Sequence, residues 1–431
     1  MPHSIPPRLL RLLGTPGFVW IVFAVVHGAL AVLNLVNFKN PYGDVLAVYP
    51  YWVDLALQGD IVGITEPWVY PLLAWVPILL ASIGGSIALP GFWIVVVTGL
   101  NAIALHLLLG TKHGRTAGLL WMVLLASLGP VAIGRIDSVT APIAIIGLLA
   151  MLRSRIGVAA TLFTIAAWMK VWPGVLWLAL VITRRERWTA VYAGAAVSLS
   201  VVVLAFIAGG TGNLASFAFE QGERGLQVES VAATPFVWMA LFGNAVIEYS
   251  REILTYQVEA GPATSMLASV LTPVMVVGVM LVLVLGVVGE RRGVNRVQLW
   301  VLMTTALVAL LIVCNKVGSP QFVAWLSVCE VALVIVRPRH ATRMIGMIVL
   351  IAVLTQLIYP WNYGAIVGEI NVFGASLMTL RNLLEIGLCA SAIASLVHVV
   401  RHPRCHQGAS GPGSVAVAPA AGSQEPLARE R

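Results

Sequence analysis

The side chains best suited to chemistry are a few carboxylates and isolated cations that lie between long apolar runs. Asp44 follows the first apolar run, in the stretch Asn40-Pro41-Tyr42-Gly43-Asp44, and it opens an amphipathic segment that reaches Gly59. A carboxylate placed in this way can accept a proton from a hydroxyl group as a general base. An Asp that follows Gly is also a good helix N-cap, so the sequence leaves both roles open for Asp44.

Further polar residues occur in short loops between apolar runs. These candidates are Tyr49, Arg135, Asp137, Lys170, Arg224, Gln227, Glu229, Lys316, Gln321 and Trp361. Lysine and arginine neutralise phosphate, and aromatic faces stack on sugar rings. Structural roles are open as well: Arg135 and Asp137 can form an ion pair within one turn, and Lys170 can extend to lipid headgroups. Trp361 can equally belong to an interfacial aromatic belt.

The composition is that of a polytopic membrane protein. Hydrophobic residues make up 59% of the 431-residue chain and charged residues only 10%, and the mean hydropathy is +0.93. Apolar runs of spanning length recur throughout the chain. The net charge of +8 reflects basic clusters between these runs, so we expect no nucleic-acid partner. No group of His, Cys and carboxylate residues has metal-ligand spacing, so we predict no cofactor, although a loosely held divalent cation stays open.

The basic clusters also predict the topology. Most of the 26 lysines and arginines fall in these clusters, whereas most of the 18 acids lie elsewhere. The positive-inside rule then places the clusters, and both termini, on the cytoplasmic side of the cell membrane, with the polar loops outside. An even number of crossings between clusters follows. We therefore interpret the apolar segments 69–88 and 231–247 as half-inserted, not as full spans.

The predicted fold is all-α, with about twelve transmembrane helices and an interfacial helix in the first outer loop. We expect a single transmembrane domain over residues 1–402 and a disordered cytoplasmic tail over residues 403–431, which is rich in Gly, Ala, Ser and Pro. Three charged residues, Glu330, Arg381 and Glu385, fall within or near apolar spans, where a functional role and a mutual pairing are both possible. The expected spans are 18–37, 91–110, 116–134, 139–152, 156–169, 171–183, 189–209, 264–289, 297–314, 321–336, 344–360 and 376–400.

Several stretches together resemble the GT-C superfamily of glycosyltransferases that use polyprenyl-phosphate sugars. The stretches are Gly43-Asp44 through Trp52, Trp68-Val69-Tyr70-Pro71, Gly129-Pro130 with Gly134-Arg135-Ile136-Asp137, Arg224 to Ser230, and Lys316-Val317-Gly318-Ser319-Pro320-Gln321 with Trp325. More narrowly, the chain is similar to glycosyltransferase family 87, the actinobacterial enzymes that add α-1,2-mannose to phosphatidylinositol mannosides. Each motif alone is weak; their order along residues 40–330 is what makes the resemblance specific.

The resemblance implies that an acid in the first outer loop is the catalytic base, which here is Asp44. A second acid in the next outer turn of related enzymes maps onto Asp137. The donor would be a polyprenyl-phosphate mannose, its phosphate bound by Lys170, Arg224, Lys316 or Arg135. Asp137, Gln227, Glu229, Gln321, Trp361 and Tyr49 are candidates for contacts with the sugar or with the glycolipid acceptor. One base opposite the leaving group predicts an inverting reaction.

Three other functions fit parts of the same pattern. The donor sugar can be arabinofuranose, because nothing in the sequence identifies the sugar. A lipid-linked sugar transporter is a second possibility, although such proteins usually have polar residues at mid-span and internal repeats. A non-catalytic partner of a cell-envelope synthase is the third, and for such a protein the loss of Asp44 would be harmless.

Overall fold

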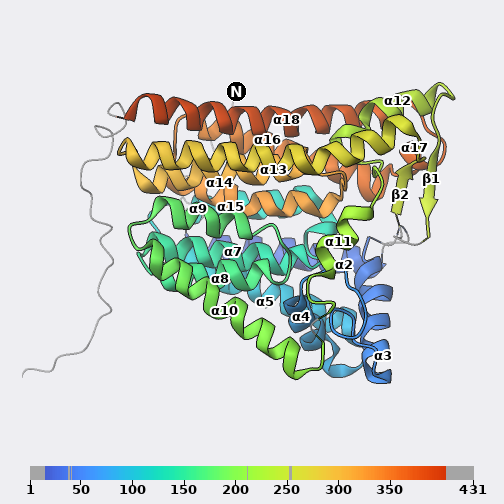
Figure 1. Cartoon of the computed structure of the whole chain (residues 1–431), viewed down its shortest axis with the longest axis horizontal. Coiled ribbons are helices and arrows are strands. Elements are labelled where there is room, and N and C mark those ends of the chain that lie inside the picture. The colour runs from blue at the N-terminus through green and yellow to red at the C-terminus, as the bar shows by residue number, and fades with distance from the viewer. Residues whose placement is uncertain (1–14, 37–38, 40, 211, 252–254, 404–431) are drawn as a thin grey trace, which may run out of the picture.

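The computed structural model describes residues 15–36, 39, 41–210, 212–251 and 255–403 (Figure 1). Within these residues the protein is mostly helical, and eight helices are long and apolar enough to cross a membrane. They are α2 (Pro16–Val36), α5 (Leu89–Leu109), α6 (Gly114–Leu128, extended to Ala132 by a 3-10 turn), α10 (Arg187–Ile207), α13 (Pro262–Arg291), α14 (Arg296–Val313), α16 (Ala341–Gln356, extended to Trp361 by a π-helical turn) and α18 (Val372–Arg401). By length and composition this is a multi-pass membrane protein.

Four of the predicted spans form shorter apolar helices. They are α7 (Asp137–Leu152), α8 (Ile156–Ala167), α9 (Gly174–Thr183), and α15 (Leu326–Val336) with the 3-10 turn Pro320–Trp325 before it. Almost every residue of α7 and α15 is buried, whereas α10 and α13 expose much of their apolar surface. The short helices α7 and α15 therefore lie at the centre of the bundle together with the long helix α14, whereas α10 and α13 lie on its outside.

The segments predicted to be half-inserted are short helices. Residues Leu72–Gly84 contain α4 (Trp75–Ala81) between two 3-10 turns, and the segment ends before Gly85, which has a φ of +83°. At about 1.5 Å per residue this helix is shorter than the ~30 Å hydrocarbon core. In the second segment, α12 (Thr234–Leu241) follows the 3-10 turn Val231–Ala233, and the chain then enters a strand at Ile247.

The fold departs from the all-α prediction in one β-hairpin. Strands β1 (Ile247–Ser250) and β2 (Thr255–Val258) pair antiparallel, with Ile247 opposite Val258. The hairpin lies at one end of the bundle (Figure 1), where α3 (Tyr49–Gln58), α11 (Ser216–Glu223), α12 and α17 (Gly364–Val367) are also found. This end of the molecule therefore collects the connections in which the sequence placed its candidate residues.

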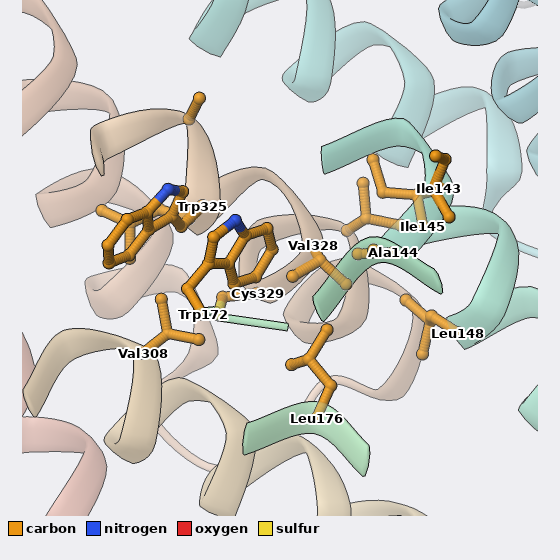
Figure 2. Close-up of a cluster of buried hydrophobic side chains, with 14 of the residues drawn as sticks. Ile143, Ala144, Ile145, Leu148, Trp172, Leu176, Val308, Trp325, Val328 and Cys329 are labelled. Atoms are coloured by element: carbon orange, nitrogen blue, oxygen red, sulfur yellow. The ribbon is translucent and has the colours of Figure 1, made fainter. Parts of the chain in front are cut away.

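The core beneath these connections contains two stacked tryptophans. The Trp172 and Trp325 rings lie 5.6 Å apart and nearly parallel, and both are buried against α7, α9, α14 and α15 (Figure 2). The Trp172 indole N–H donates to Thr140 Oγ1 at 3.1 Å. Large planar side chains packed in this way hold the helix ends in fixed positions, which gives the loops above them a rigid base.

The predicted tail 403–431 lies outside the described residues from position 404 onward, as do residues 1–14.

Candidate functional site

The candidate site is a cavity of about 710 Å³ at the hairpin end of the bundle. Its walls come from the π-helical turn Asp44–Val48, the loop before α4, the turn before α7, the segment after α11, the hairpin, the loop before α15 and the end of α16. Of the residues that the sequence indicated, the cavity is lined by Asp44, Arg135, Arg224, Gln227, Glu229 and Gln321. Segments that are far apart in the chain thus meet at one site.

Asp44 faces this cavity as half of an ion pair. Its Oδ2 lies 3.4 Å from Nε of Arg135, and the Asp44 side chain is 28% exposed. Gly43, not Asp44, occupies the cap position of the π-helical turn, and Asp44 is the first residue within the turn. The capping role that the sequence allowed for Asp44 is therefore wrong, and its carboxylate is accessible from the cavity.

Arg135 is fixed on several sides. Its Nη1 donates to the Gly134 carbonyl at 3.0 Å, and its Nη2 lies 3.4 Å from the hydroxyl of Tyr359. Tyr49 holds the turn that contains Arg135 in place, because its hydroxyl accepts a hydrogen bond from the Ile136 N–H at 3.0 Å. Tyr49 is fully buried and supports the turn without lining the cavity.

Asp137 and Lys170 form a second acid–cation pair behind the cavity wall. Lys170 Nζ lies 3.6 Å from Asp137 Oδ2, and the Trp325 indole N–H donates to Asp137 Oδ1 at 2.6 Å. The Asp137 side chain has no exposed surface. Lys170 Nζ also lies 4.5 Å from the ring centroid of Tyr70, which lines the cavity. The pairing of Arg135 with Asp137 that the sequence allowed does not form, since each has another partner.

Arg224 brings a second cation into the cavity. Within the part of the chain that the structure describes, it takes part in no ion pair, and its Nε has no hydrogen-bond partner. Burial lowers the pKa of Arg224, and Tyr70 and Glu220 act in the opposite direction. An arginine remains charged under such conditions, so Arg224 is a cation that can bind an anion.

Lys316 lies beside this segment but does not line the cavity. The Lys316 carbonyl accepts a hydrogen bond from the Gln227 N–H at 3.0 Å, and Lys316 as a whole is 7% exposed. Burial, and to a lesser degree Arg224, lowers the pKa of Lys316. Lys316 therefore contributes charge near Arg224 and connects two loops through its backbone.

Gly318 explains why these two loops can lie so close together. A Cβ atom at Gly318 would come within 2.1 Å of the Ser230 nitrogen and 2.2 Å of the Glu229 carbonyl carbon. No side chain fits in that space, so glycine is required by the contact. The close contact keeps Gln227 and Glu229 on one side of the cavity and Gln321 on another.

Glu229 connects the cavity to α18. Its Oε2 lies 3.3 Å from Nη1 of Arg381, and Arg381 Nε lies 3.7 Å from Glu385 Oε1. Arg381 also donates to the Glu229 carbonyl and, at 2.7 Å, to Asn382 Oδ1. Burial raises the pKa of Glu229 to about 7, although Arg381 acts in the opposite direction. Of the three charged residues for which the sequence allowed mutual pairing, Arg381 and Glu385 are paired, with Glu229 as a further partner. Glu330 is not part of this group, and its two carboxyl oxygens are buried without a hydrogen-bond partner.

The cavity has an aromatic wall, and the sequence reasoning chose none of its residues as a site candidate, although Trp52, Trp68 and Tyr70 lie in stretches that carried the resemblance. Eight aromatic residues line it: Tyr51, Trp52, Trp68, Tyr70, Tyr249, Tyr256, Tyr359 and Tyr363. Trp361, which was chosen as a candidate, does not line the cavity, and its carbonyl accepts a hydrogen bond from Lys39. Tyr359 has non-helical backbone angles and precedes Pro360, so helical spacing did not place Tyr359 and Tyr363 on one side. Nothing in the sequence placed the hairpin tyrosines here either.

The cavity combines the carboxylates of Asp44, Glu220 and Glu229 with two arginines and a wall of aromatic rings. Such a cavity can bind a sugar by stacking and an attached anion by charge, with a proton acceptor beside them. Among the described residues, no group of three or more His, Cys, Asp or Glu side chains could hold a metal ion.

Comparison with protein-family models found no match to the chain, and a search of curated proteins found none either.

Proposed function

We propose that this protein is a membrane glycosyltransferase that moves a sugar, mannose in the first instance, from a polyprenyl phosphate to a glycolipid acceptor such as a phosphatidylinositol mannoside. The observation that supports it most is the cavity in which Asp44, Arg135 and Arg224 lie among eight aromatic side chains. Its volume of about 710 Å³ falls in the usual range for small-molecule sites. The function also agrees with the resemblance noted in the sequence.

In this proposal Asp44 is the general base. It accepts the proton of the acceptor hydroxyl while that oxygen forms a bond to the anomeric carbon of the donor sugar. The bond from the anomeric carbon to the phosphate oxygen breaks, and its electron pair leaves with the polyprenyl phosphate. Attack opposite the leaving group inverts the anomeric centre, so a β-linked donor gives an α-linked product.

Arg135 and Arg224 have separate tasks. Arg135 orients Asp44 through the 3.4 Å ion pair. Arg224 has no ion-pair partner among the described residues, so it is the better candidate to bind the donor phosphate and to stabilise the charge that develops on it. Glu229, Gln227 and Gln321 line the cavity and offer hydrogen bonds to sugar hydroxyls.

A smaller apolar cavity offers a place for the prenyl chain. It has a volume of about 380 Å³ and is lined by residues of α8, α9 and α10 together with Pro71, Trp168 and Val171. Trp168 and Val171 flank Lys170, whose ammonium group contacts Tyr70 at the wall of the larger cavity. Lys170 lines neither cavity, but it precedes Val171 of the apolar cavity in the chain and contacts Tyr70 of the polar one. In this proposal the junction between the prenyl chain and its phosphate lies near Lys170.

The direct test is sugar transfer by the purified, detergent-solubilised protein, in separate reactions with labelled polyprenyl-phosphate mannose and polyprenyl-phosphate arabinose and a mannolipid acceptor. We expect transfer from the mannose donor without any ion gradient. Transfer from the arabinose donor alone would change the sugar assignment and keep the reaction class. Gradient-dependent movement of the intact donor across vesicles, with no transfer from either donor, would replace the enzyme by a transporter.

A further inference from the structure

A second polar cavity, of about 490 Å³, lies between α16 and α18 at the opposite end of α16 from the candidate site. The candidate site is lined by Tyr359, just beyond the end of α16, whereas this cavity is lined by Arg339, His340 and Arg343 at its start. The 16 residues of α16 separate the two by about 24 Å. The proposed glycosyl transfer makes no use of this second cavity.

One end of the cavity is strongly basic. Arg339 and Arg343 are always charged, and His340 and His398 lie with them in the wall, whereas none of the described lining residues is acidic. Arg339 Nη1 lies 3.1 Å from His398 Nε2, and because arginine can only donate, the histidine nitrogen accepts. His340 is the N-cap residue of α16 and gives it no side-chain cap, so the positive end of the helix dipole adds to the same field.

The other wall is apolar and made of small side chains. Gly387, Ala390 and Ala394 follow one another along α18 and leave space beside the helix, with Ser391 and Ser395 next to them. Ala390 and Ala394 are exposed, so the cavity opens to the outside of the bundle. The exterior of α18 remains apolar toward Leu383 and Ile386, which are 58% and 42% exposed. A polar, basic end therefore continues into an apolar surface along a helix of spanning length.

We infer that this groove binds a membrane phospholipid with an anionic headgroup, its phosphate between Arg339 and Arg343 and the start of an acyl chain along Gly387, Ala390 and Ala394. Two features favour a lipid over any other occupant. The basic end complements an anionic headgroup, as basic pockets between transmembrane helices do elsewhere. The small-residue wall and the exposed apolar surface beyond it match a hydrocarbon chain, which a free anion lacks.

Native mass spectrometry of the full-length protein in detergent tests this, with titrations of phosphatidylglycerol and of phosphatidylcholine that carry the same acyl chains. We expect phosphatidylglycerol to bind at least about tenfold more tightly. The double variant Arg339→Gln/Arg343→Gln should remove that preference. The control variant Arg185→Gln/Arg187→Gln removes the same charge from exposed positions in another basic loop and should preserve it.

A second variant separates the lipid from a small anion. Ala390→Leu fills the apolar wall without a change in charge and should weaken phosphatidylglycerol binding severalfold, while millimolar inorganic phosphate should not displace the lipid. Equal binding of the two lipids, or equal losses in the Arg339/Arg343 variant and in the control, would overturn the proposal. Displacement by phosphate, together with normal lipid binding by Ala390→Leu, would overturn it in favour of a small-anion site.

Discussion

Two acid–cation pairs lie close together in this molecule and have opposite surroundings. Arg135 and Asp137 are separated by one residue, yet Arg135 pairs with Asp44 at the cavity while Asp137 pairs with Lys170 inside the protein. The Asp44 side chain is 28% exposed and that of Asp137 is fully covered. Residues two apart at the start of a helix point in different directions, so proximity in sequence did not mean contact.

The difference in exposure indicates a chemical role for the Asp44 carboxylate and a structural role for the Asp137 carboxylate. The Asp44 carboxylate is partly exposed and therefore open to substrate, although its partner Arg135 is only 10% exposed. A fully buried carboxylate is costly unless an opposite charge and hydrogen bonds compensate it. For Asp137, the Trp325 indole N–H donates to Oδ1 and Lys170 supplies the opposite charge, while Oδ2 has no hydrogen-bond partner. We therefore expect changes at Asp44 to alter activity and changes at Asp137 to alter stability.

The largest expected effect is on activity, from Asp44→Asn. The amide keeps the shape of the carboxylate but cannot take a proton, so sugar transfer should fall about 10³-fold. Arg135 also loses its counter-charge, so the midpoint of thermal unfolding should fall as well, but less than in Asp137→Asn, because the Asp44 side chain is partly exposed. The rate of transfer at saturating acceptor is the measurement. Asp54→Asn, an exposed position on α3, is the matched control and should retain full activity. Equal activity of Asp44→Asn and wild type would remove Asp44 as the base and leave Glu220 and Glu229, the other acids that line the cavity.

The second effect is on stability, from Asp137→Asn. This change leaves the Lys170 ammonium without its counter-charge and should lower the free energy of unfolding by about 3 kcal/mol. Thermal unfolding of the solubilised protein measures it. The double variant Asp137→Asn/Lys170→Met should recover part of the loss, because no unpaired charge remains. If the single variant instead unfolds like wild type but loses transfer, Asp137 acts in the reaction and the contrast with Asp44 fails.

The sequence was informative about helices and less so about the cavity. Apolar runs placed the eight long helices within a few residues of their observed ends, because hydrophobic length is a local property. Six of the eleven candidate residues line the cavity, since polar residues between apolar runs have few other places to lie. The twelve-span count is open, because four of those runs are shorter helices that are buried or partly buried.

The remaining features depend on contacts between distant segments. The hairpin brings Tyr249 and Tyr256 into the cavity wall, and the partner of Glu229 is Arg381, 152 residues away. No periodicity or local motif records such pairings. Gly318 is an intermediate case: a glycine in a polar loop was visible in the sequence, but its contact with Ser230 was not.

The third prediction concerns Glu229. Like Asp44 it lines the cavity, and like Asp137 it is buried. Burial raises its pKa to about 7 from 4.5, so the folded protein holds a proton that the unfolded chain releases. The contribution of this proton to the free energy of unfolding is therefore complete below pH 4.5 and is lost as the pH rises through 7. It amounts to about 3 kcal/mol at most. Unfolding midpoints of wild type between pH 5 and 7.5 should decline with rising pH, and those of Glu229→Gln should decline less. Glu66→Gln, at an exposed position, controls for general charge effects. The same slope in all three proteins would show that Glu229 is ionised throughout this range.

The smallest effect is expected at Arg224, the cavity cation that has no ion-pair partner among the described residues. Loss of one charged hydrogen bond to the donor phosphate should raise KM for the polyprenyl-phosphate sugar about 10- to 100-fold in Arg224→Gln. Arg224→Lys should recover part of this loss, because it keeps the charge but not the planar guanidinium. Arg251→Gln removes an exposed charge near the hairpin and should leave KM unchanged. If KM is unchanged in Arg224→Gln, the phosphate binds Arg135 instead. The ion pair between Arg135 and Asp44 would then open when the donor binds. In that case this pair would take part in donor binding as well as in proton transfer.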